Sequence, residues 1–126
     1  MEVEFILYVA NQEKSSVFYA EIFQKKPELD VPGMTEFKLG DNIKLGLMPE
    51  TGIAKILSNK VPHPSSGNGI PRCELYLKTN NALDLYKRAI KARAINISAP
   101  LARDWGDIVS YVADLDGHVL AFAQSL

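Results

Sequence analysis

The stretch that decides the fold is Trp105-Gly106-Asp107-Ile108-Val109-Ser110-Tyr111-Val112-Ala113-Asp114-Leu115-Asp116-Gly117-His118-Val119-Leu120-Ala121-Phe122-Ala123-Gln124. Two apolar runs rich in Val, Ile, Tyr and Phe flank its Asp116-Gly117 pair. Glycine at such a turn adopts positive φ without a Cβ clash, and the flanking residues suit a pleated surface. The stretch therefore predicts a β-hairpin, with the C-terminal strand beside the strand that precedes it.

Composition predicts one soluble globular domain of 126 residues, with 47% hydrophobic and 23% charged residues. The 14 basic and 15 acidic residues give no broad charged surface for nucleic acid or an anionic membrane. No apolar run approaches the roughly 20 residues of a membrane-spanning helix. The single cysteine, Cys73, is expected to be a small buried hydrophobe, and without a disulfide or a leader-like N-terminus the expected location is the cytoplasm.

Residues 2–9 predict a strand, because alternate side chains form one apolar face that is expected to be core: Val3, Phe5, Leu7 and Val9. Asn11 can cap a following helix at residues 12–25. That helix carries a stripe at spacings of three and four: Ser15, Phe18, Tyr19, Ile22 and Phe23. It is expected to cover the apolar face of the strand.

Further strands are expected at residues 34–39 and 43–48. With the first strand and the helix they are interpreted as parts of a β-α-β-β-β module over about residues 1–49. Periodicity then fails in residues 50–71, where Pro, Gly and Ser accumulate. This segment is expected to be a linker or mobile flap, in which Ile53 to Leu57 could form one helical turn.

The second half repeats the first over about residues 72–126. It predicts a strand at residues 73–79, a helix at 81–93 after an asparagine cap, and a short strand at 95–98 that ends before Pro100. The hairpin completes the second β-α-β-β-β module.

Internal duplication accounts for this pattern. Glu4-Phe5-Ile6-Leu7 superimposes on Glu74-Leu75-Tyr76-Leu77, and Ile43 to Leu47 superimposes on His118 to Phe122. Each module would have a helix on only one face of its sheet. Pairing the bare faces, within the chain or across a dimer, would give a curved mixed sheet around a cavity. Because eight strands with two helices leave much apolar surface, we also expect a homodimer.

This α+β arrangement of tandem modules over the whole chain resembles the vicinal oxygen chelate superfamily of glyoxalases, bleomycin-resistance proteins and extradiol dioxygenases. Ser15-Ser16-Val17-Phe18-Tyr19 and Asp114-Leu115-Asp116-Gly117 are similar to sequence markers of that superfamily. The resemblance implies the glyoxalase/bleomycin-resistance fold and one such domain over residues 1–126.

In metal-dependent members of that superfamily, the ligands are an early residue of each module's first strand, usually His, and a Glu of each module's last strand. The corresponding positions in this sequence are Glu4, Gly46, Glu74 and Ala121. Glycine and alanine cannot bind a metal, so the first shell that transition metals prefer is incomplete. His63 and His118 are expected to be surface or loop residues, and no cofactor is expected.

Glu4 and Glu74 are nevertheless the sharpest candidates, because the repeat would direct both carboxylates into one cavity. Two like charges raise one pKa or recruit a cation. That cation could be a divalent metal such as Mg²⁺, a basic ligand group, or Lys78. In the alternative interpretation, Glu4 faces water and Glu74 pairs with Lys78.

Aromatic and methionine side chains could line a planar ligand: Tyr8, Met48, Tyr76, Trp105 and Tyr111. The alternative is packing in the core or at a dimer interface. The sequence therefore predicts a metal-independent small-molecule binding protein, resembling the bleomycin-resistance branch, for a planar or cationic ligand. A glyoxalase-like lyase or isomerase, or a dioxygenase, with Glu4 or Glu74 as general base is the second hypothesis, and a purely structural or regulatory dimer is the third.

Overall fold

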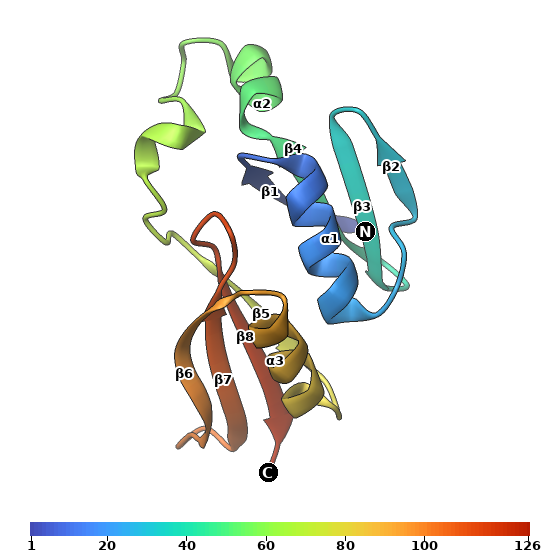
Figure 1. Ribbon diagram of the computed structural model, residues 1–126, viewed down its shortest axis with the longest axis vertical. Coiled ribbons are helices and arrows are strands. Elements are labelled where there is room, and N and C mark those ends of the chain that lie inside the picture. The colour runs from blue at the N-terminus through green and yellow to red at the C-terminus, as the bar shows by residue number, and fades with distance from the viewer. The chain divides into compact units, whose positions relative to one another are not determined.

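The computed structural model describes residues 1–126 as two compact units, one mainly within residues 1–68 and the other mainly within residues 69–126 (Figure 1). Each unit contains one four-stranded sheet with a parallel pair and two antiparallel pairs of strands. The α+β fold class is thereby confirmed. No helix is both long and apolar enough to cross a membrane.

The first unit has the strand order β1-β4-β3-β2. Its elements are β1 (Val3–Val9), α1 (Gln12–Phe23), β2 (Leu29–Val31), β3 (Met34–Gly40), β4 (Ile43–Pro49), α2 (Glu50–Leu57) and the 3₁₀ helix η1 (Pro64–Gly67). The sequence analysis missed β2, because three residues are too short to show an alternating pattern. Gly33, with a φ of 96°, makes the turn that joins β2 to β3.

Helix α1 begins as predicted, because the Asn11 side chain accepts a hydrogen bond from the Lys14 backbone N–H at 2.9 Å. Its apolar stripe is buried at Ser15, Phe18, Tyr19 and Ile22. The Gln12 side chain ties the helix to the β2–β3 hairpin by donating to the Val31 carbonyl at 2.8 Å and accepting from the Gly33 N–H at 3.0 Å. The helix therefore reaches the hairpin through its first residue.

The predicted core face of β1 is only partly buried. Val9 is fully buried, but Val3 and Phe5 are 39% and 49% exposed. The reason is that β1 lies at the edge of its sheet, where one side has no neighbouring strand. Beyond β4, α2 is longer than the single helical turn expected there, and it buries Ile53.

The second unit repeats this architecture with the order β5-β8-β7-β6. Its elements are β5 (Glu74–Lys78), α3 (Ala82–Lys91), β6 (Ile95–Ala102), β7 (Asp107–Ala113) and β8 (Val119–Ser125). Ile6 pairs with Gly46 in the first sheet, and Tyr76 pairs with Ala121 in the second. This register confirms the internal repeat, and β7 and β8 confirm the predicted hairpin.

Strand β6 differs from the prediction, because it continues through Pro100 to Ala102. It is the edge strand of its sheet, and its register with β7 shifts between Ser98 and Leu101. An edge strand with an irregular register tolerates proline, which cannot donate a ladder hydrogen bond. The core of this unit lies where α3 packs against β7 and β8.

Candidate functional site

The face of the second sheet opposite α3 carries the main group of candidate residues, which we call the Tyr76 face. Alternation along the strands places these side chains on it: Glu74, Tyr76, Lys78, Asp107, Val109, Tyr111, Ala121 and Ala123. Tyr76, Ala121 and Tyr111 form one row across β5, β8 and β7. Tyr111 packs against a buried cluster of Val109, Ala121 and Ala123. The small side chain of Ala121 separates Tyr76 from Tyr111.

Asp107 organises the polar part of this face and is only 6% exposed. The Tyr76 hydroxyl donates to its Oδ2 at 2.7 Å, and Lys78 Nζ lies 2.9 Å from its Oδ1. The hydrogen bond from Tyr76 and then that from Lys78 lower the pKa of the Asp107 carboxyl below its ordinary value. Asp107 is therefore an ionised acceptor at neutral pH.

Trp105 and Tyr76 form an exposed aromatic pair on this face. The indole Nε1–H donates to the Tyr76 hydroxyl oxygen at 3.0 Å. Desolvation raises the pKa of Tyr76, as does the hydrogen bond to Asp107, so the phenol stays protonated. Trp105 is 56% exposed and Tyr76 is 38% exposed. Together they offer fixed aromatic surface that a planar molecule could cover.

Tyr111 has a different neighbour, because the Arg103 guanidinium lies 5.3 Å from the centre of its ring. Arg103 Nη2 also donates to Ser98 Oγ at 2.7 Å. One cation thus already contacts Tyr111. Lys78 contacts Asp107 rather than Glu74 in its ion pair, which corrects the interpretation that Glu74 is its partner.

Glu4 is positioned in the first unit by the absence of a side chain at Gly46. A Cβ atom at Gly46 would lie 2.7 Å from Glu4 Oε1, so the carboxylate occupies that space. Glu36 is the cross-strand neighbour of Gly46, which brings the two carboxyl groups together. The hydrogen bond to Glu36, followed by desolvation, raises the pKa of Glu4 to about 7. Lys44 Nζ lies 3.9 Å from Glu36 and 3.5 Å from Glu28.

The group that raises the pKa of Glu4 is therefore Glu36, which lies in the same unit. The sequence analysis missed Glu36, Lys44 and Asp107. Glu36 could have been found from the strand register, because it is the cross-strand neighbour of Gly46, which leaves space for its side chain. Lys44 could have been found in the same way, because it lies opposite Glu4. Asp107 had no signal beyond its place at the start of the predicted hairpin.

The other candidates lie apart from these groups. Tyr8 and Met48 are half-buried neighbours across β1 and β4. His63 Nδ1 accepts from the Ser65 N–H at 3.2 Å in an exposed turn. Cys73 is an exposed free thiol, so the expectation that it would be buried is wrong, because it precedes β5 rather than lying within it.

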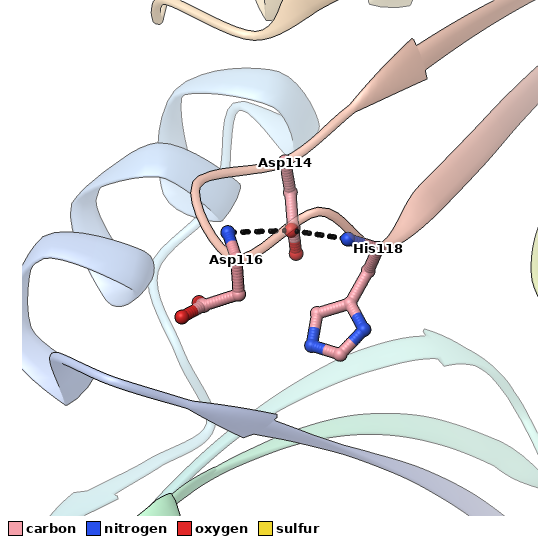
Figure 2. Close-up of side chains that lie close together, drawn as sticks. All are labelled: Asp114, Asp116 and His118. Atoms are coloured by element: carbon pink, nitrogen blue, oxygen red, sulfur yellow. Dashed lines mark hydrogen bonds between the residues drawn. The ribbon is translucent and has the colours of Figure 1, made fainter. Parts of the chain in front are cut away.

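Asp114, Asp116 and His118 gather at the β7–β8 turn, where their potential ligand atoms lie within 4.8 Å of one another (Figure 2). Carboxylate and imidazole groups are ligands that divalent cations accept. The Asp114 Oδ1 atom also accepts from the backbone N–H groups of Asp116 and His118 at 2.9 and 2.8 Å. These two bonds stabilise the hairpin turn, which explains the burial of Asp114 without a metal.

We expect Glu4 to titrate near neutrality, and Glu36→Gln to lower its pKa, because glutamine removes the like charge. The folded pKa of about 7 exceeds the ordinary value of 4.5. Glu4 therefore stabilises the fold fully below pH 4.5, and this contribution is lost as the pH rises through 7. Carboxyl ¹³C NMR against pH measures the titration of Glu4 in the unmodified protein and in the Glu36→Gln variant. Glu13→Gln, on α1, is the control, and an ordinary Glu4 pKa in the unmodified protein would contradict the hydrogen bond between Glu4 and Glu36.

Comparison with known proteins finds a matching family model and similar solved structures. The family model of the glyoxalase-like domain matches residues 3–126. No curated protein matches the chain. Similar solved structures include a glyoxalase-related enzyme from Fulvimarina pelagi, with 20% identity and a TM-score of 0.83 over 99% of this chain and 88% of that chain.

Two further structures show the range of proteins with this fold. A glyoxalase/bleomycin resistance protein/dioxygenase family enzyme from Burkholderia phytofirmans PsJN has 16% identity and a TM-score of 0.81, over 98% of this chain and 97% of that chain. TnmS3, an antibiotic binding protein from Streptomyces sp. CB03234, has 21% identity and a TM-score of 0.70, over 100% of this chain and 96% of that chain. The family model, together with the repeated sheets, shows that the chain belongs to the glyoxalase-like domain family of the vicinal oxygen chelate superfamily.

Proposed function

We propose that this protein binds a small molecule without a metal, as in the bleomycin-resistance branch, and that the ligand is planar or cationic. The observation that carries the proposal is the exposed Trp105 ring, held by its hydrogen bond to Tyr76. A large apolar ring on an otherwise polar loop is a surface that a ligand can cover. Tyr111, on the same sheet as Tyr76, is proposed as a further contact of this ligand. Tyr8 and Met48, which are neighbours in the first unit, are proposed as ligand contacts of that unit.

Two features support this choice among members of the family. Gly46 and Ala121 occupy the positions where metal-dependent members carry a ligand, and neither has a donor atom. The similarity to TnmS3 shows that the fold also occurs in an antibiotic binding protein. For a cationic ligand, Glu4 and Glu36 offer a carboxyl pair in the first unit. Glu74 is a separate exposed carboxylate of the second unit.

We expect Trp105→Ala to weaken the binding of a planar probe about tenfold, which corresponds to about 1.4 kcal/mol. The physical reason is the loss of stacking and of buried apolar area. Calorimetric titration with 2-naphthamide, 2-naphthoate and 2-(aminomethyl)naphthalene measures the dissociation constants. Leu115→Ala, which removes another exposed apolar side chain, is the control. Absence of binding by all three probes, or equal binding by Trp105→Ala, would contradict the proposal.

We also propose that the protein is a cytoplasmic homodimer. Val3 and Phe5 are large exposed apolar side chains on β1, and a second copy could cover them. The free thiol of Cys73 suits a reducing compartment. Sedimentation velocity that gives a monomer at micromolar concentration would contradict the dimer.

A glyoxalase-like lyase or isomerase, or a dioxygenase, is the second candidate, and the carboxyl pair of Glu4 and Glu36 favours it. A carboxylate with a pKa of about 7 suits general base catalysis at neutral pH. Glu74 would be the second catalytic candidate. Elemental analysis of the purified protein separates the candidates, because a stoichiometric divalent metal would favour the enzyme.

A further inference from the structure

The hydrogen bonds around Asp107 determine which polar groups of the Tyr76 face can donate to a ligand and which can accept from it. Tyr76 has one hydroxyl hydrogen, and Asp107 receives it at 2.7 Å. The phenol oxygen also accepts from Trp105 Nε1 at 3.0 Å. Towards a ligand, Tyr76 can therefore act only as an acceptor, through its remaining lone pair.

Lys78 has the complementary character. An ammonium group has three N–H donors and no acceptor. One donor faces Asp107 Oδ1 at 2.9 Å, and the side chain is 54% exposed, so the others reach solvent. Lys78 Nζ and the Tyr76 oxygen contact the two oxygens of one carboxylate. A donor and an acceptor are thus held next to each other.

We propose that the Tyr76 face selects planar ligands whose edge carries a neutral carboxamide or lactam, with the carbonyl oxygen accepting from Lys78 and the N–H donating to the Tyr76 oxygen. This inference rests on the proposed function, because it names the ligand class of the same face. The amide plane is coplanar with a conjugated ring, which can stack on Trp105 while its edge meets the polar pair.

The same arrangement disfavours ligands that carry a charged group at this edge. A carboxylate could accept from Lys78, but its second oxygen would face the lone pair of Tyr76, whose hydrogen is committed to Asp107. An ammonium group could donate to Tyr76, but it would face the ammonium group of Lys78. Asp107 already balances the charge of Lys78, so neither charged ligand gains a net opposite charge. Specificity of this kind depends on repulsion of the wrong ligand as much as on attraction of the right one.

The three probes test this inference, because they share the naphthalene ring system and differ in the polar group attached to it. We expect 2-naphthamide to bind the full chain at least tenfold more tightly than 2-naphthoate or 2-(aminomethyl)naphthalene. Tyr76→Phe and Lys78→Met should each reduce this preference to less than about threefold, since each removes one of the two hydrogen bonds to the amide. Lys87→Met, an exposed lysine of α3, should leave the preference unchanged.

Asp107→Asn provides a second, directional test, because it removes the charge that balances Lys78. Its expected effect is a gain in affinity for 2-naphthoate relative to 2-naphthamide. Thermal unfolding of each variant with and without probe shows whether the variant is folded. Equal affinity of the unmodified protein for the three probes would overturn this inference and leave the proposed function standing, whereas no binding of any probe would overturn both. Retention of the full amide preference by both Tyr76→Phe and Lys78→Met would also overturn it.

Discussion

Phe122→Ala is expected to lower the free energy of unfolding by about 3–5 kcal/mol, the range for deletion of a buried aromatic side chain. Phe122 is only 1% exposed and lies in β8, a central strand of the second sheet. Its ring belongs to the core on which α3 packs. The deletion leaves a cavity that neighbouring strands cannot close, because backbone hydrogen bonds hold them on both sides. Urea denaturation measures the difference.

Phe5→Ala is the matched control, since it deletes the same side chain from a strand where it is 49% exposed. For the monomeric chain we expect a cost within about 0.5 kcal/mol, as is usual for surface positions. A cost as large as that of Phe122→Ala would mean that Phe5 is buried in solution, as the proposed homodimer would allow. A small cost for Phe122→Ala would contradict its place in the core.

Gly117→Ala is expected to be the most damaging change at the hairpin turn. Gly117 has a φ of 90°, where a residue with a Cβ stores about 1–3 kcal/mol of strain. Its Cβ would also lie 2.9 Å from the carbonyl oxygen and 3.0 Å from the Cα of Gly69. Both are backbone atoms, so they cannot rotate away as a side chain would. We therefore expect overpacking to add about another 1–3 kcal/mol.

Gly106→Ala separates the two causes, because Gly106 has a φ of 96° but no atom within 4 Å of the added Cβ. It should show the strain alone. Chemical denaturation of the two variants gives the difference directly. Equal costs would show that the Gly69 backbone yields to the new methyl group, and would contradict the predicted overpacking.

The local elements of this protein were predictable because each has a periodic signature a few residues long. The stripe of α1 and its Asn11 cap predicted the helix, and Asp116-Gly117 predicted the hairpin. The repeated register also made Gly46 and Ala121 recognisable as equivalent positions. By contrast, β2 was too short for a pattern, and Pro100 suggested an end to β6 that an edge strand does not require.

The sequence by itself determined the two modules except for β2, because alternation and helical spacing are properties of neighbouring residues. Only the tertiary structure decided which charged and polar groups meet. Tyr76 and Asp107 are 31 positions apart, and their contact depends on the register of β5 and β7 on either side of β8. Glu4 meets Glu36 because Gly46 leaves space between them. Such pairings depend on distances across a sheet, which no local pattern encodes.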